Sequence, residues 1–241
     1  MIKSFIEKKL KSFLAFVEIN FKIRFGNKSA VDIYYDELQK NCYEFFKKDM
    51  QESSIFLKVE DIRNFSIYRA IQGLNNSDNN NFFLEFGVYT GGSINLFAKQ
   101  LQSVNKEVYG FDSFEGLKED WLTHVFFPKG ALSLNKKKPK VLKNVKLIAG
   151  YIQDTLEEFL NQSEKKRIIF AHMDMDTYES TKFALIKIKP FLKKGSIILF
   201  DEFYGYPNWE KEEYKAFKEV FNKDEFKYIA FCESEVAIEM L

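Results

Sequence analysis

The sequence predicts a doubly wound α/β fold, and two observations lead to this prediction. From residue 82 onward, short apolar runs alternate with segments that have helical periodicity. Runs such as RIIF (167–170) and SIILF (196–200) are apolar on both faces, which is typical of parallel strands covered by helices on each side. Alternating strands and helices of this kind build a mostly parallel sheet of the Rossmann-like type.

The N-terminal part of the chain has a different character. Residues 1–74 carry helical periodicity, and an Asn-rich break, GLNNSDNNN (73–81), follows them. We therefore expect an N-terminal helical extension over residues 1–78 and a main domain over residues 79–241. The first helix is amphipathic with a lysine-rich polar face. We expect it to pack on its own domain or on a partner copy in a homo-oligomer, in preference to a peripheral contact with an anionic membrane.

The main domain is expected to contain seven strands. Their predicted bounds are 82–86, 107–112, 145–150, 167–174, 195–202, 226–231 and 234–240. Helices are predicted at 92–101, 154–160, 180–189 and 208–221. The last two strands have no helix between them, so we expect an antiparallel hairpin at one edge of the sheet. The long segment 113–144 is expected to be irregular.

Composition restricts the class of function. A formal net charge of +1 over 241 residues gives no electrostatic reason to expect a nucleic-acid partner. Cys42 and Cys232 stand in no metal-binding or redox spacing, and without a disulfide framework a cytoplasmic protein is expected. No stretch is long and apolar enough to span a bilayer. Charges interrupt the apolar face of the first helix and no cleavage site follows, so a signal peptide is not expected.

Polar residues and glycines follow the first two strands, where ligands of such folds bind. The first strand leads into EFGVYTGGS (85–93), whose G-x-x-x-G-G spacing differs from the dinucleotide and phosphate-loop patterns. Glu85 adds negative charge, which suits a ligand with a cationic or amine-bearing end. Asp112, after the second strand, can accept both hydroxyls of a ribose. A ribose joined to a positively charged centre favours S-adenosylmethionine over NAD or ATP.

Acidic residues follow the fourth and fifth strands, at Asp174 and at Asp201 and Glu202. Neighbouring strand ends lie about 5 Å apart, so these carboxylates repel one another unless a cation joins them. Hard oxygen ligands suit Mg²⁺, which would hold and acidify a substrate hydroxyl. The alternative is that Asp201 and Glu202 only cap a helix or form ion pairs.

Four motifs together resemble a known family. FLEFGVYTGGS, VYGFDSFEGLKEDW, HMDMDTYESTKFAL and GSIILFDEFYGYPNWEKEEYKAF occur in this order over roughly residues 82–222. They resemble the macrocin/mycinamicin-type sugar O-methyltransferases, which are class I S-adenosylmethionine-dependent enzymes, and are more distantly similar to catechol O-methyltransferase. The resemblance implies the Rossmann-like class I methyltransferase fold, with a mostly parallel seven-stranded sheet, an antiparallel C-terminal edge and N-terminal helices.

The resemblance also implies the site residues. Those implied around the methionine part of S-adenosylmethionine and its loop are Glu85, Gly87, Tyr89, Thr90, Gly91, Gly92 and Ser93. Those implied at the ribose are Asp112 and Ser113, and those at or near the adenine are Ile152, Gln153 and Asp154. A divalent metal is implied at Asp174, Asp201 and Glu202, and Asp174 also counts among the cofactor contacts. The family more often carries Asp at the position of Glu202.

The base that removes the acceptor proton stays open. In the catechol enzyme a lysine three residues beyond the first metal-binding acid acts as base, and here that position is Thr177. Besides Asp174 and Asp201, which would act through the metal, the candidate catalytic residues are Tyr178, Glu179 and residues of segment 203–213. Metal-acidified hydroxyls can also react without a separate base.

The expected reaction is methyl transfer to a hydroxyl of a sugar, or of a glycan or natural-product precursor. Seven lysines and no acids occur between residues 129 and 146. They form either a solvated face or a contact for a phosphate-bearing acceptor, such as a nucleotide-linked sugar or a phosphorylated glycan precursor. The aromatic residues that would stack on a sugar, or pack in the core, are Phe114, Trp121, Phe203, Tyr204, Tyr206 and Trp209.

There are three alternatives to sugar O-methylation. The same fold could methylate an amine, a phenol or a phosphoramidate-like group. A nicotinamide oxidoreductase is disfavoured by the glycine spacing. A non-catalytic S-adenosylmethionine-binding protein is disfavoured by the acids at all three metal positions.

Overall fold

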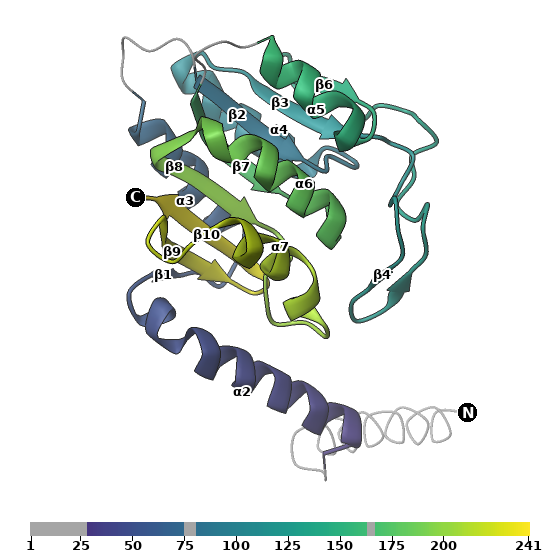
Figure 1. Ribbon diagram of the computed structural model, residues 1–241, viewed down its shortest axis with the longest axis vertical. Helices are drawn as coiled ribbons and strands as arrows, with labels where there is room; N and C mark the ends of the chain where they lie inside the picture. Colours follow the sequence, from purple (N-terminus) through teal and green to yellow (C-terminus); the bar gives the residue numbers. More distant parts are fainter. Residues whose placement is uncertain (1–27, 75–80, 163–166) are drawn as a thin grey trace, which may run out of the picture. The chain divides into compact units, whose positions relative to one another are not determined.

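The computed structural model describes residues 28–74, 81–162 and 167–241 (Figure 1). The amphipathic helix expected at the N-terminus lies outside the described residues. The expected domain boundary between residues 78 and 79 also lies outside them. Both therefore stay predictions.

The chain divides into two units, residues 1–41 and 42–241. Within the first unit, the described residues start at position 28 and include the first part of helix α2 (Ala30–Gln51). Ser29 and Asp32 close the start of this helix: the backbone N–H of Asp32 donates to Ser29 Oγ at 3.2 Å, and that of Ser29 donates to Asp32 Oδ2 at 2.9 Å. This reciprocal pair satisfies N–H groups that have no partner inside the helix.

An eight-stranded sheet is the framework of the second unit, with strand order β1-β9-β10-β8-β7-β2-β3-β6. Its strands are β1 (Ser54–Ile55), β2 (Asn81–Phe86), β3 (Val108–Asp112), β6 (Val145–Ala149), β7 (Arg167–Met173), β8 (Leu192–Phe200), β9 (Phe226–Cys232) and β10 (Glu235–Met240). Only β10 runs antiparallel to its neighbours, β8 and β9. The predicted mostly parallel α/β sheet with its antiparallel C-terminal hairpin is confirmed.

Helices cover both faces of this sheet. They are α3 (Val59–Gln72), α4 (Gly92–Leu101), α5 (Ile152–Asn161), α6 (Tyr178–Ile188) and α7 (Glu213–Val220), with 3₁₀ turns at η1 (Gln102–Val104), η2 (Lys189–Phe191) and η3 (Trp209–Lys211). Helix α3 contacts α4 on one face, while α5, α6 and α7 follow one another on the other face (Figure 1). This arrangement explains why the central strands are apolar on both sides.

Helix α3 belongs to the core of the sheet unit. Its residues Ile62, Ile67 and Ala70 are fully buried, and they share one apolar cluster with α4 and with strands of the sheet. Helix α4 buries Ile94, Phe97, Ala98 and Leu101 at helical spacing. The side chains of α3 therefore reach the sheet on the same face as the helix that follows the glycine loop.

Three local features differ from the sequence-based expectation. A two-residue strand, β1, adds to the sheet parallel to β9, so that β9 is not the outermost strand. Segment 113–144 contains a short hairpin of β4 (Trp121–Leu122) and β5 (Phe126–Phe127). The helix expected over 208–221 is interrupted, because Glu212 has φ −107° and ψ −124°, outside the helical region, and α7 begins only at Glu213.

The aromatic residues considered for sugar stacking lie in the core. Their exposed fractions are Phe114 1%, Trp121 5%, Phe203 0%, Tyr204 7%, Tyr206 1% and Trp209 3%. Phe203 and Trp209 pack with Phe46 in an aromatic cluster with ring centroids 5.6–6.0 Å apart. Burial of this kind favours the packing interpretation of these residues.

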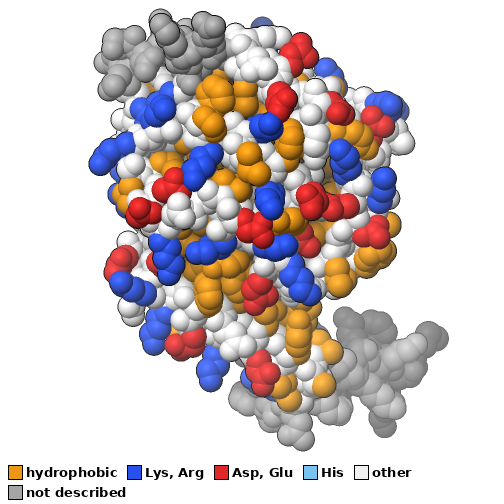
Figure 2. Space-filling view, in the orientation of Figure 1, with side chains coloured by type: hydrophobic (Ala, Val, Ile, Leu, Met, Phe, Trp, Pro, Cys, Tyr) orange, Lys and Arg blue, Asp and Glu red, His pale blue; other side chains and the backbone are white. Residues whose placement is uncertain are grey.

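The surface shown in Figure 2 mixes both signs of charge. Lys and Arg side chains alternate with Asp and Glu side chains over this face, in keeping with the formal net charge of +1. None of the helices formed by described residues has the length and apolar character needed to cross a membrane.

Truncating Ile67 tests the packing of α3. Because Ile67 is fully buried in the shared cluster, Ile67→Ala should lower the free energy of unfolding by about 2–5 kcal/mol. The neighbouring Tyr68 is 57% exposed, so Tyr68→Ala should change it by less than about 1 kcal/mol. Urea unfolding followed by circular dichroism measures both. Equal effects would show that α3 does not pack as described.

Candidate functional site

Backbone hydrogen bonds continue between the strands just beyond their carboxyl ends. Asp174 donates its N–H to β2 at 2.8 Å, Asp201 donates to β7 at 3.0 Å, and Gly87 donates to β3 at 2.9 Å. These bonds fix the first residue after each strand relative to the neighbouring strand. The acids that follow β7 and β8 are therefore held on the sheet itself, not on free loops.

Gly87 lets the chain pass very close to Asp174. It has φ +86°, and a Cβ placed on it would lie 1.6 Å from the carbonyl oxygen of Asp174. Only glycine fits such a position. Gly91, with φ +84°, then starts helix α4. The two glycines thus have separate tasks, one at the close approach of two strand ends and one at the start of the helix.

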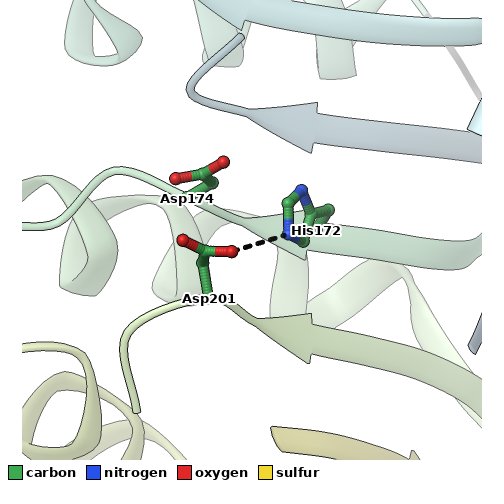
Figure 3. A group of neighbouring side chains, drawn as sticks. All are labelled: His172, Asp174 and Asp201. Carbon is green, nitrogen blue, oxygen red and sulfur yellow. Dashed lines mark ion pairs between the residues drawn. The ribbon is translucent and has the colours of Figure 1, made fainter. Parts of the chain in front are cut away.

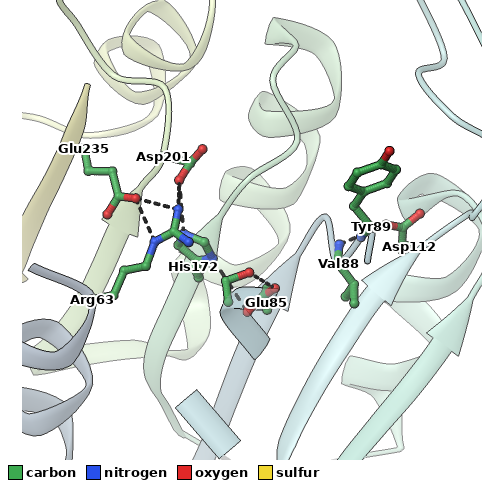
Figure 4. A network of polar contacts seen from close by, with 9 residues as sticks. Arg63, Glu85, Val88, Tyr89, Asp112, His172, Asp201 and Glu235 are labelled. Carbon is green, nitrogen blue, oxygen red and sulfur yellow. Dashed lines mark hydrogen bonds and ion pairs between the residues drawn. The ribbon is translucent and has the colours of Figure 1, made fainter. Parts of the chain in front are cut away.

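Asp112 holds the loop that contains these glycines (Figure 4). Its Oδ2 accepts the N–H groups of Val88 at 2.9 Å and Tyr89 at 2.7 Å, and its Oδ1 accepts the N–H of Phe114 at 2.6 Å. A carboxylate has about four lone-pair positions, so this geometry leaves one of them on Oδ1. Asp112 can therefore hold the loop and still accept one hydroxyl of a bound ribose.

A pocket opens at the carboxyl ends of β2, β3, β6 and β7. Its walls are Gly87, Tyr89, Phe111, Asp112, Ser113, Gly116, Leu117, Lys118, Leu132, Gly150, Tyr151, Ile152, Gln153, Asp174, Met175, Asp176, Thr177 and Ser180. Apolar and aromatic side chains line one part of it and carboxylates another. Such a mixture suits a ligand with a flat ring system at one end and a cationic centre at the other.

The pocket collects about half of the expected cofactor residues. Those that line it are Gly87, Tyr89, Asp112, Ser113, Ile152, Gln153 and Asp174, and those that do not are Glu85, Thr90, Gly91, Gly92, Ser93 and Asp154. Glu85 and Ser93 lie buried beneath the loop, where Ser93 Oγ donates to Glu85 Oε1 at 2.8 Å. As cofactor contacts, these residues all stay predictions.

Asp174 and Asp201 meet beside a buried histidine (Figure 3). Ligand atoms of His172, Asp174 and Asp201 lie within 4.8 Å of one another. Burial raises the pKa of Asp174 well above its usual value, and the nearby carboxylate of Asp201 raises it further. Two carboxylates that face one another in this way form a site of the kind that binds a hard divalent cation.

His172 is completely buried and neither of its ring nitrogens has a hydrogen-bond partner. Its Nδ1 lies 3.7 Å from Glu85 Oε2 and its Nε2 lies 3.9 Å from Asp201 Oδ1. The imidazole therefore stands between the acid beneath the glycine loop and the acid after β8 (Figure 4).

The side chain of Arg63, on α3, reaches the carboxylate of Asp201. Its Nε donates to Glu235 Oε1 at 2.7 Å, and its terminal nitrogen pairs with both Glu235 and Asp201. Burial lowers the pKa of Arg63, but the carboxylates of Asp201 and Glu235 outweigh burial and raise the pKa above its usual value. Burial and then Asp201 raise the pKa of Glu235 to about 9.

Further carboxyl groups surround this centre. Asp176 lines the pocket with φ +63°, and burial, followed by the neighbouring Glu202, raises its pKa well above the usual value. Burial and then Asp201 raise the pKa of Glu202 to about 7. The fully buried Glu213 accepts the N–H of Glu202 at 3.1 Å. Glu202 thus lies next to Asp201 and Asp176 but outside the group that includes His172.

Residues 84–203 match the family model described as a methyltransferase domain. This segment is a methyltransferase domain. It spans the glycine loop, Asp112 and the two acids at 174 and 201, so the residues that line the pocket lie within it. No curated protein matches the chain.

Solved structures of methyltransferases share the fold of this methyltransferase domain. CalS11, described as a calicheamicin methyltransferase, aligns with a TM-score of 0.58 at 21% identity over 88% of this chain and 94% of its own. An apo structure of CalS11, described as a TDP-rhamnose 3′-O-methyltransferase, gives 0.56 at 20% over 88% and 96%. The O-methyltransferase NovP gives 0.54 at 20% over 75% and 78%. At the level of fold, the resemblance to the class I sugar O-methyltransferases is confirmed.

The candidate bases Tyr178 and Glu179 do not line the pocket of the methyltransferase domain. The hydroxyl of Tyr178 donates to Glu219 Oε2 at 2.5 Å and accepts from Lys182 at 2.7 Å, in a polar group between α6 and α7. Glu179 is exposed in the first turn of α6. Their proposed catalytic roles remain untested predictions.

The sequence interpretation gave no role to several residues of this site. His172 lies in β7, two positions before Asp174, and the sequence-predicted strand 167–174 contains both, so the period of two would have placed both side chains on one face. Arg63 and Glu235 carry no such signal, since they reach Asp201 from α3 and from the start of β10.

Substituting Gly87 tests the close approach of the strand ends. Gly87→Ala should lower the free energy of unfolding by about 2 kcal/mol or more, since it adds both positive-φ strain and a clash with the backbone of Asp174. Gly92 is the matched control, because nothing lies within 4 Å of a Cβ placed there. Gly92→Ala should leave the unfolding midpoint in urea nearly unchanged. A Gly87→Ala protein as stable as the parent would contradict the described geometry.

Proposed function

We propose that this methyltransferase domain transfers a methyl group from S-adenosylmethionine to a hydroxyl of a sugar, with a divalent cation, preferably Mg²⁺, bound at the strand ends. One observation carries the proposal: Asp174 both lines the pocket and belongs to the acidic group with Asp201. A methyl donor in the pocket and an acceptor at the acids would therefore be neighbours.

The pocket supports S-adenosylmethionine as the donor. Asp112 has a free acceptor position for a ribose hydroxyl, and Phe111, Leu117 and Ile152 supply apolar surface for an adenine ring. The carboxylates of Asp174 and Asp176 stand at the other side of the pocket, where a sulfonium would gain from negative charge. Glycines at the strand end allow the methionine part to approach the backbone.

The residues at the strand ends fit a divalent cation. Asp174 and Asp201 offer hard oxygen donors, and the buried imidazole of His172 has an unpartnered Nε2 beside them. Glu202, the third ligand that the family resemblance implies, lies next to this group. A cation held here would lower the pKa of an acceptor hydroxyl.

For methyl transfer, the main task of the protein is to position the methyl donor and the acceptor. The acceptor oxygen attacks the methyl carbon, the carbon–sulfur bond breaks, and its electron pair returns to sulfur, which leaves neutral S-adenosylhomocysteine. We assign the hydroxyl proton to Asp176, which faces the pocket, in preference to Tyr178 or Glu179, which do not line it. Holding donor and acceptor in line supplies most of the remaining rate enhancement.

A nucleotide-linked or phosphorylated sugar is the acceptor we favour. All seven lysines between residues 129 and 146 are exposed, and of these Lys136 pairs with Glu115 and Lys146 with Glu107. Lys118 adds a cationic group in the pocket wall, where it donates to Gln153 at 3.0 Å. These cations support an acceptor that carries phosphate.

Donor binding depends on Asp112. Asp112→Asn should weaken the binding of S-adenosylmethionine about tenfold to hundredfold, because the single acceptor oxygen of the amide cannot serve both the loop N–H groups and the ribose. Asp224→Asn is the matched control, since Asp224 is exposed and does not line the pocket. Isothermal titration calorimetry measures both. Parental affinity in Asp112→Asn would argue against this pocket as the donor site.

Metal dependence is tested by Asp201→Asn and by chelation. Asp201→Asn should retain donor affinity within about threefold yet lose about 99% of turnover, because the cation loses a charged ligand. Turnover is measured as S-adenosylhomocysteine released with nucleotide-linked sugars, before and after EDTA and after added Mg²⁺. Asp224→Asn, at an exposed acid in the turn before β9, should behave as the parent. Full turnover both in Asp201→Asn and in EDTA would refute the metal part of the proposal.

A further inference from the structure

We propose that Arg63 competes with the divalent cation for Asp201 and thereby sets the cation affinity of the site. This inference rests on the proposed function, in which Asp201 is a metal ligand. It makes Arg63, a residue of helix α3 outside the matched methyltransferase segment, a positioning residue for the acid that follows β8.

The guanidinium of Arg63 directly contacts Asp201, the proposed metal ligand. The terminal nitrogen of Arg63 pairs with Asp201 Oδ1, the same oxygen that lies 3.9 Å from His172 Nε2. The side chains of Arg63 and Asp201 are each 19% exposed. Glu235, the second partner of the guanidinium, is almost fully buried, with 2% of its side chain exposed. The guanidinium of Arg63 thus lies where water is partly excluded, and charges interact strongly in such an environment.

The position of this charge matters for a cation. Asp201 and Asp174 offer ligand atoms within 4.8 Å of one another, so an ion between them would lie close to the guanidinium. Like charges at such a separation repel strongly when water is largely excluded. The guanidinium also occupies a lone pair of Asp201 Oδ1 that a cation would otherwise use. Both effects weaken cation binding relative to a site without Arg63.

A purely structural role for Arg63 is less satisfactory. The same helix and the same strand are already tied by a second pair, Arg69 with Glu239 at 2.8 Å. That pair lies away from Asp201 and is more open, since 39% of the Arg69 side chain is exposed. The fold therefore contains a bridge between α3 and β10 that involves no candidate ligand, and Arg69 provides a matched control for Arg63.

The test is the affinity for Mn²⁺ alone, measured by electron paramagnetic resonance of the free ion on the full chain. Arg63→Gln removes the charge but keeps hydrogen-bonding capacity, and Arg63→Met removes both. Either neutral variant should bind Mn²⁺ about tenfold or more tightly than the parent. Arg63→Lys keeps the charge, so its affinity for Mn²⁺ should stay within about threefold of the parent. The affinity of Arg69→Gln for Mn²⁺ should stay within about twofold of the parent.

If Arg63 only stabilised the fold, its removal would not increase the affinity for Mn²⁺. The direction of the change in Mn²⁺ affinity therefore distinguishes the two roles of Arg63. Unchanged or weaker Mn²⁺ binding in Arg63→Gln, with parental affinity for S-adenosylmethionine, would overturn the inference and leave the proposed function standing. A parent that binds no Mn²⁺ would refute both the metal part of the proposed function and the inference. If both neutral variants failed to fold while Arg69→Gln folded, Arg63 would be a stability residue and the inference would be wrong.

Discussion

Placing several carboxyl groups side by side, buried or partly buried, is unfavourable, and at the carboxyl ends of β7 and β8 the fold does so. Asp174, Asp176, Glu202 and Glu213 all have pKa values raised first of all by burial and then by neighbouring carboxylates, which include Asp201 in each case. A group buried in this way releases its proton reluctantly or attracts a cation. Arg63 supplies one positive charge, shared between Asp201 and Glu235. The proposed divalent cation would supply the rest, and the functional interpretation depends on this imbalance of charge.

The backbone explains why the fold keeps these groups together. Strand-end hydrogen bonds from Gly87, Asp174 and Asp201 to neighbouring strands fix the acids, and the φ of Gly87 brings the glycine loop against Asp174. Beneath the loop, Glu85 lies next to His172, which in turn lies next to Asp201. The pocket proposed for the donor and the acidic group are therefore two parts of one edge of the sheet. Such an arrangement can align an acceptor oxygen with a methyl group without large movements.

The sequence was most informative where the signal is local. Apolar runs predicted seven of the eight strands of the main sheet, and glycine spacing together with strand-end acids predicted where a ligand pocket and an acidic group would lie. Two-residue β1 was missed because it is too short to show a period. Arg63 and Glu235 were missed because their approach to Asp201 depends on how α3 and β10 pack against the sheet. The aromatic residues of segment 203–209 looked suitable for a sugar, and only their burial in the structure distinguished packing from binding.

A crystal structure with S-adenosylhomocysteine and Mn²⁺ tests the central claim most directly, because anomalous scattering locates the manganese and the cofactor sulfur in one experiment. The account predicts a manganese peak coordinated by Asp174 and Asp201, and the cofactor in the pocket beside Asp112 with its sulfur facing that ion. A cofactor in this pocket with no manganese at the two acids, or a cofactor bound elsewhere, would contradict it.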